Sequence, residues 1–307
     1  MNTEEIINWL LEGDSAIRYQ TKRDLLGIND PLLQNEIEKQ GWGKNLLDLQ
    51  NQNAYWGQYF YQPKWISTHY TLLELKEMAI RRNIDNLQKI VNIIFNNHKS
   101  FDGGINASRA NRKSDVCVCG MTMNYSCYFG VDEEKTKSVT DFILSQKMPD
   151  GGFNCNLNSI GAVHCSMHTT LSVLEGFEEY LSSGYTYRKN DILEAKSHAE
   201  EFLLMHSLYL SDKSGKIIRP DFLKFRYPAR WFYNILRALD YFRQTNSKYD
   251  NRLESALNII SKKRTKEGLW KQCSPHTGLV HFEMEKAGKA GRWVTLKALR
   301  VLRHYGK

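Results

Sequence analysis

Apolar residues recur every three or four positions over most of this chain, which is the spacing of one buried face of an α-helix. No segment alternates apolar and polar residues between turn residues, so strands are not expected. Six helical segments are less polar and rich in small, hydroxyl and aromatic side chains: 15–27, 65–80, 114–131, 162–177, 229–242 and 291–306. Six amphipathic segments alternate with them: 1–12 and stretches near 30–40, 84–97, 134–147, 190–207 and 249–262.

A short turn sequence repeats along the chain. FDGGIN at 101–106 and PDGGFN at 149–154 are 48 residues apart, and KEGLW at 266–270 is a weaker copy. Glycine adopts the positive φ that ends a helix and reverses the chain. Six helix pairs joined by such turns predict an all-α fold, an (α/α)6 toroid in which an inner barrel is wrapped by an outer one. The prediction is a single domain over 1–307, with the first helix beside the last; an open solenoid is the alternative, but its ends would need polar caps.

The segment RANRKSDVC at 109–117 carries a more specific pattern than the turns. With the turns and helix pairs, it resembles the α/α-toroid superfamily of protein prenyltransferase β subunits and squalene-type terpenoid cyclases. The resemblance implies that Arg109, Asn111 and Arg112 bind an isoprenoid diphosphate. It also implies that Asp115 and Cys117 ligate Zn²⁺, together with a histidine that opens the next inner helix.

The chemistry of these residue types agrees with a catalytic zinc site. A carboxylate, a thiolate and an imidazole leave one coordination position open for water or a substrate thiol. Asp115 and Cys117 can converge only where a loop enters a helix, with Asp115 extended at the N-cap. The histidine is His164 or His168, which we expect to lie one turn apart on one helix face.

Simpler interpretations remain open for the same residues. Asp115 can be only a helix cap, and the cysteines at 117, 119 and 127 can be small core residues. Cys119 or Cys165 could also complete a closed, structural metal site.

Several other residues are candidates for the same function. Aromatic side chains of the inner helices would line a central cavity suited to an isoprenoid chain: Trp65, Tyr70, Trp231, Tyr233 and Trp293. His276, His281 and Glu283 form a loose metal-binding pattern in the loop 271–290, and Arg226 and Arg230 could extend a phosphate patch.

These features predict a zinc-dependent, prenyltransferase-like transferase that binds an isoprenoid or prenyl diphosphate, with a possible partner protein subunit. One alternative is a non-catalytic toroid that binds a lipid or a partner. Another is a terpenoid-cyclase relative, although Asp115-Val116-Cys117-Val118 lacks the central acid of the protonating Asp-x-Asp-Asp motif. The sequence does not identify the acceptor or the isoprenoid length.

Composition narrows these possibilities. The 307 residues are 41% hydrophobic and 25% charged, which is typical of a globular protein. The formal net charge of +8 is dispersed among acidic residues, so nucleic acid is not the expected partner. No apolar run is long enough to cross a membrane, and the acidic start lacks the features of a secretory signal. We therefore expect a cytoplasmic protein whose six cysteines are thiols or metal ligands.

Overall fold

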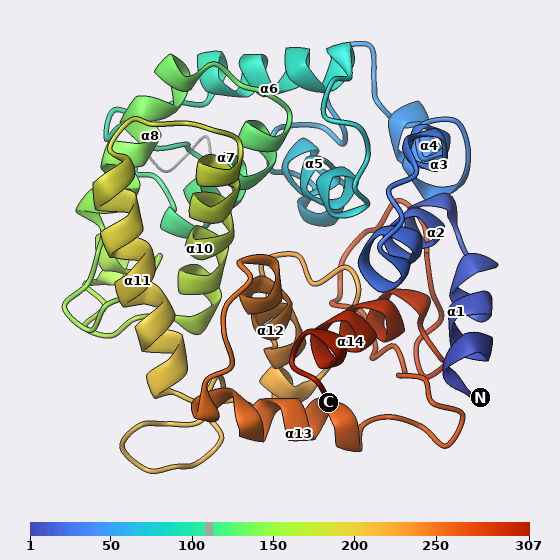
Figure 1. Ribbon diagram of the computed structural model, residues 1–307. Helices are drawn as coiled ribbons and strands as arrows, with labels where there is room; N and C mark the ends of the chain where they lie inside the picture. Colours follow the sequence, from blue (N-terminus) through green and yellow to red (C-terminus); the bar gives the residue numbers. More distant parts are fainter. Residues whose placement is uncertain (108–112) are drawn as a thin grey trace. The chain divides into compact units, whose positions relative to one another are not determined.

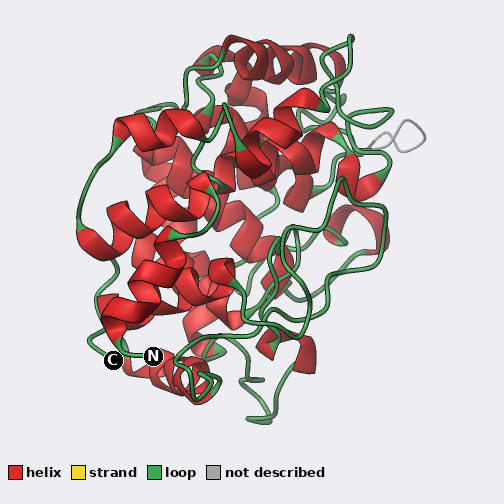
Figure 2. Cartoon of the chain, turned by 90° about the vertical axis from the view of Figure 1, so that its right-hand side faces the viewer, coloured by secondary structure: helices red, strands yellow, loops and turns green. Residues whose placement is uncertain are grey.

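The structure is a computed structural model that describes residues 1–107 and 113–307. Over these residues the chain consists of helices, turns and loops, with no strand (Figure 2). Three isolated β-bridges join loop residues. The all-α prediction is therefore confirmed for the part of the chain that is described, and none of its helices is long and apolar enough to span a membrane.

All twelve predicted helical segments contain a helix. The bounds are α1 Thr3–Leu11, α2 Ser15–Thr21, η1 Lys22–Leu26, α3 Pro31–Glu36, α4 Gly41–Asp48, η2 Lys64–Ile66, α5 Thr68–Glu77, α6 Asp85–Asn97, α7 Val116–Tyr128, α8 Glu133–Ser145, α9 Leu157–Ile160, α10 Met167–Ser182, α11 Lys189–Met205, η3 Pro220–Leu223, α12 Ile235–Gln244, η4 Asn251–Leu253, α13 Glu254–Lys262 and α14 Arg292–His304 (Figure 1). Helices α4 and α9 were not predicted, and two of the predicted inner helices begin later than expected.

Those two late starts have a common cause. Helix α10 begins at Met167 because the side chain of Ser166 caps it by accepting a hydrogen bond from the Thr169 amide. Helix α12 begins at Ile235 because Asn234 caps it in the same way. The residues before each cap are loop, so the predicted starts at 162 and 229 are wrong.

The contacts divide the chain into two compact units. Unit 1 comprises 1–49, 77–81 and 205–307, and unit 2 comprises 50–76 and 82–204. Both ends of the chain belong to unit 1, where the Arg292 side chain at the start of α14 donates a 3.0 Å hydrogen bond to the Trp9 carbonyl of α1. The first and last helices therefore meet, as predicted. Closure of all the helix pairs into a ring stays a prediction.

The repeated turn has one geometry in four places, of which the sequence indicated three. In each copy the backbone amide of the first residue donates to the carbonyl of the fifth residue. The amide of the fourth residue donates to the carbonyl of the first, and the fourth residue has a positive φ. The copies are 51–56, 100–105, 148–153 and 265–270, with φ of 65° at Ala54, 89° at Gly103, 98° at Gly151 and 88° at Gly268. The first copy was missed because alanine replaces glycine at the strained position.

The same turns anchor the helices that follow them. The sixth residue of each copy is fully buried. Its amide donates to a hydroxyl or thiol of the next helix, the acceptors being Thr68, Cys119, Thr170 and Thr295. Each turn thereby fixes the position of a less polar helix through a satisfied buried amide.

Helices α7 and α10 of unit 2 lie side by side, and their backbones come unusually close to each other (Figure 1). A Cβ atom at Gly120 would lie 2.8 Å from both the Ser172 carbonyl oxygen and the Val173 Cα, and one at Gly176 would overlap the Gly120 carbonyl. The two glycines therefore let the backbones touch. This contact brings the beginning of α10 close to the beginning of α7, where the predicted site lies.

Candidate functional site

Two of the predicted site residues lie at the start of α7. Asp115 is the N-cap residue and its backbone is extended, as predicted. Its carboxylate does not cap the helix. Asp102, from the preceding turn, instead holds the approach to α7 by accepting 2.7 Å bonds from the Ser114 amide and hydroxyl. Cys117 is partly exposed, whereas every other residue of α7 is buried.

The closest partner of Cys117 is Cys155, two residues beyond the second glycine-rich turn. The Cys155 sulfur accepts a 3.1 Å hydrogen bond from the Cys117 amide and a 3.3 Å bond from the Thr169 hydroxyl. The Cys117 thiol is next to this sulfur. The neighbouring Cys117 thiol, together with the hydroxyl and the amide, lowers the pKa of Cys155 against the effect of burial, whereas the pKa of Cys117 is raised. Cys155 is therefore the thiol of this pair that ionises first.

Charged and phenolic groups surround this thiol pair. Burial raises the pKa of Asp115, and Lys64 opposes that shift. Burial lowers the pKa of Lys64, and Cys117 and Asp115 oppose it. The Tyr61 pKa is raised by burial and further by Cys117, Asp115 and Cys155. These residues form one cluster, which is in contact with solvent because every member is partly exposed: Tyr61, Lys64, Asp115, Cys117 and Cys155.

A fully buried histidine lies behind the cluster in unit 2. His69 Nδ1 is 3.3 Å from the Tyr125 hydroxyl, which donates to Thr122. Among the described residues its Nε2 has no hydrogen-bond partner, and aromatic rings, including those of Tyr61 and Tyr70, surround it. Burial, and then Lys64, lower its pKa to about 3, so the imidazole is neutral at physiological pH.

The predicted histidine ligands do not join the start of α7. His164 lies in the loop before α10, not at its first turn, so it does not share a helix face with His168. Its side chain is 70% exposed, and its Nδ1 lies 3.8 Å from Asp150. His168 is the second residue of α10 and is partly buried. The sequence placed His164 wrongly because it did not anticipate Ser166 as the cap.

The positions of these side chains bear on the predicted zinc site. Over 1–107 and 113–307, no three His, Cys, Asp or Glu side chains are grouped so that they could hold one metal ion. The pair Cys117 and Cys155 offers two sulfur donors, whereas His164 is directed to Asp150. Asp115, Cys117 and a histidine do not form such a group among the described residues. Zinc binding stays a prediction.

The remaining predicted residues fall into three groups. Arg109, Asn111 and Arg112 lie outside the described residues. Trp65 and Tyr70 are buried in unit 2, with their ring centroids 4.9 Å apart, next to the His69 ring.

The third group belongs to unit 1. Trp293 stacks on Tyr227 at 4.2 Å, and Phe232 stacks between Trp231 and His276. Tyr233 donates a 2.6 Å hydrogen bond to the Leu208 carbonyl, and Arg226 donates to the Ser274 carbonyl. Burial, and then Arg230, lower the pKa of His281 to about 4. Glu283 is exposed.

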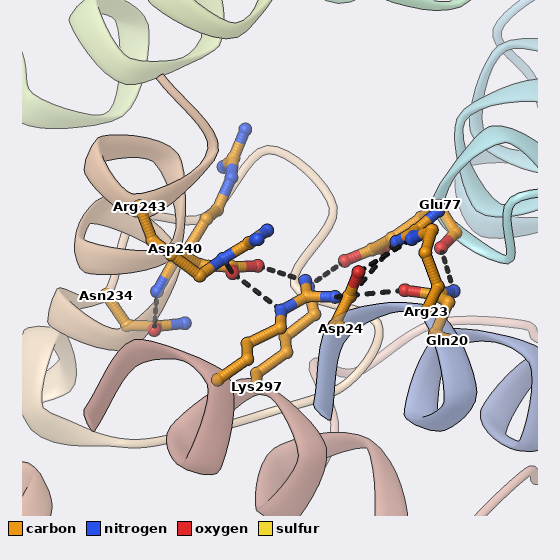
Figure 3. Close-up of polar contacts among 10 residues, drawn as sticks. Gln20, Arg23, Asp24, Glu77, Asn234, Asp240, Arg243 and Lys297 are labelled. Atoms are coloured by element: carbon orange, nitrogen blue, oxygen red, sulfur yellow. Dashed lines mark hydrogen bonds and ion pairs between the residues drawn. The ribbon is translucent and has the colours of Figure 1, made fainter. Parts of the chain in front are cut away.

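Unit 1 contains a different polar cluster, a buried ionic network (Figure 3). Arg300 of α14 donates to both carboxylate oxygens of Asp240 in α12, and also to Asp24 at 2.7 Å. Arg243 and Arg23 donate to these same aspartates, and Lys297 pairs with Glu77. Burial alone would favour the neutral acid, but Arg300 and Arg243 hold the pKa of Asp240 well below its usual value.

Sequence reasoning missed three members of the unit 2 cluster: Tyr61, Lys64 and Cys155. Cys155 had a usable signal, because it directly follows the turn sequence PDGGFN and that turn packs against the helix after it. Tyr61 lies in a loop and Lys64 is the first residue of the short helix η2, so no periodic pattern in the sequence linked them to α7. Neither a protein-family model nor a curated protein matches this sequence.

Proposed function

We propose that the chain is a prenyltransferase-like transferase that binds an isoprenyl diphosphate where α7 begins. The observation that carries the proposal is the gathering of Lys64, Asp115 and the Cys117–Cys155 thiols at one solvent-accessible place. A cation next to a helix N-terminus suits a diphosphate, because ammonium and amide groups both stabilise its charge. The adjacent carboxylate and thiols are groups that could accept or position a reacting partner.

Aromatic residues beside this cluster support an isoprenoid as the apolar part of the ligand. Lys64 lies 4.9 Å from the Trp65 ring, and the Tyr61 and Tyr70 rings are 5.5 Å apart. Rings of this kind bury apolar chains and stabilise developing positive charge. Arg109 and Arg112, outside the described residues, are expected from the resemblance to add diphosphate contacts. Zinc enters no step of the proposal.

The proposal is tested by titration calorimetry with farnesyl diphosphate and with farnesol as matched probes. Replacing Lys64 with Met should weaken diphosphate binding about tenfold, the loss of one charge-assisted contact, and leave farnesol binding unchanged. Lys147→Met is the control, since Lys147 forms an exposed ion pair with Glu194. The double replacement of Arg109 and Arg112 with Ala should act in the same direction as Lys64→Met.

Turnover separates a transferase from a non-catalytic binding protein. The wild-type chain should release inorganic diphosphate from farnesyl diphosphate when a cysteine-containing peptide is supplied as acceptor. Tight binding without release would favour the lipid-binding alternative. Equal losses for both probes in Lys64→Met, or no binding of either by the wild type, would contradict the proposed site.

A further inference from the structure

The thiol pair of unit 2 has the geometry of a reactive dithiol. The Cys155 sulfur receives two hydrogen bonds, from the Cys117 amide and the Thr169 hydroxyl. Hydrogen bonds to sulfur stabilise the thiolate, and the amide comes from the first turn of a helix, where the field also favours negative charge. Both cysteines are partly exposed residues.

We propose that Cys155 is the reactive thiolate of this chain and that Cys117 is its resolving thiol, so that a hydroperoxide converts the pair into a disulfide. The Cys155 thiolate attacks the terminal peroxide oxygen, an S–O bond forms, the O–O bond breaks, and hydroxide or alkoxide leaves. Cys155 is then a sulfenic acid. The Cys117 sulfur attacks it, the S–S bond forms, and the sulfenic hydroxyl leaves as water with the Cys117 proton.

Some groups around the pair disfavour negative charge on the two sulfurs, and others favour it. Asp115 disfavours a second negative charge on either sulfur, and Cys119 has a similar weak effect on Cys117. Lys64 interacts favourably with the Cys117 sulfur, and Tyr61 faces both thiols as a neutral phenol. The hydrogen bonds from the Cys117 amide and the Thr169 hydroxyl both go to the Cys155 sulfur, so Cys155 is the thiol of the pair that is placed to react as the thiolate, with Cys117 next to it. The inference does not rest on the proposed isoprenoid ligand.

The experiment treats the reduced, full-length protein with hydrogen peroxide and identifies the products by peptide mass spectrometry. The wild type should form the Cys117–Cys155 disulfide. Cys117→Ser should stop at a sulfenic acid on Cys155, which dimedone traps, and Cys155→Ser should form neither product. Thr169→Val should slow the reaction severalfold, because it removes one of the two hydrogen bonds to the Cys155 sulfur.

Cys165 is the matched control within the same unit. It is also partly exposed, but burial and its hydrogen bond to Asp150 raise its pKa. Cys155 should react at least about tenfold faster than Cys165, as expected from their thiolate fractions. Equal rates at the two cysteines, dimedone adducts mainly on Cys117, or no disulfide in the wild type would overturn the proposal. None of these outcomes depends on isoprenoid binding, so this test and that of the proposed function fail separately.

Discussion

The two polar clusters described above, one in each unit, differ in how far their groups are paired. In unit 1 the buried charges of α12, α14 and η1 are paired with one another, with Arg300 held between Asp240 and Asp24. In unit 2 the Asp115 carboxylate does not cap its helix, His69 Nε2 has no partner, and the two cysteines contact solvent. A buried charge must be matched to be tolerated, whereas a binding site keeps hydrogen-bonding capacity for its ligand. The unit 1 network therefore serves stability, and the unit 2 cluster is the better candidate for function.

The largest expected effect is the loss of Arg300. Replacing it with Met leaves Asp240 and Asp24 buried without their main counter-ion, which costs about 3–5 kcal/mol of unfolding free energy. Urea denaturation measures this loss. The control is Lys44→Met, which breaks an exposed ion pair and should cost less than about 1 kcal/mol. A similar small loss for both variants would mean that the network does not stabilise unit 1.

In unit 2 the stability should depend most on a backbone contact, that between α7 and α10, and not on a charged group. Gly120→Ala forces α7 and α10 apart, because its Cβ would lie 2.8 Å from atoms of the α10 backbone. We expect a loss of about 1–3 kcal/mol in urea denaturation and slower peroxide oxidation of Cys155, since Thr169 moves away with α10. Gly184→Ala, where a Cβ meets nothing within 4 Å but φ is +86°, should lower stability through backbone strain alone and leave the oxidation rate of Cys155 unchanged. A Gly120→Ala variant that keeps both its stability and its oxidation rate would contradict the close-packing account.

Glu285 gives unit 1 a dependence on pH that its ion pairs lack. It accepts hydrogen bonds from the Arg292 and Trp293 amides at the start of α14, and burial raises its pKa to about 7. Between its ordinary value of 4.5 and about 7, the folded chain holds a proton that the unfolded chain has lost. The unfolding free energy of the wild type should therefore fall across this window relative to Glu285→Gln. A constant difference between the two proteins would contradict the raised pKa.

The smallest change in stability is expected at His69. Replacing it with Phe removes a buried nitrogen that has no hydrogen-bond partner and keeps a ring among the rings of Phe60, Tyr61 and Tyr70. Thermal unfolding should show stability unchanged or raised by up to about 1 kcal/mol. A loss above about 2 kcal/mol would mean that the His69 bond to Tyr125 is structurally essential and would weaken the contrast between the units.

Helix periodicity and turn chemistry made most of the local fold predictable. Asp102 and Gly103 marked a turn whose geometry recurs at Gly268, where the sequence match was weak. Ala54 has the same positive φ without a glycine, so its turn was missed. The starts of α10 and α12 were missed because Ser166 and Asn234, as caps, override the apolar periodicity that continues upstream.

The candidate site was predictable only in part. The N-cap position of Asp115 and the place of Cys117 follow from local sequence, and both were correct. The partner of Cys117 depends on how the segment after the second turn packs against α7, which no local pattern encodes. Lys64 reaches the site from η2, a single 3-10 turn, so only the three-dimensional arrangement reveals it.

Amide hydrogen exchange of the full chain, with and without farnesyl diphosphate, tests most directly which unit holds the ligand site. Bound ligand should slow exchange in the first turn of α7, in residues 152–156 and in the segment around Lys64, because the ligand suppresses local opening there. The amides of α12 and α14, next to the ionic network of unit 1, should exchange at the same rates as in the free protein. Protection confined to α12 and α14, or no protection at a saturating concentration, would contradict the assignment of the functional site to the start of α7.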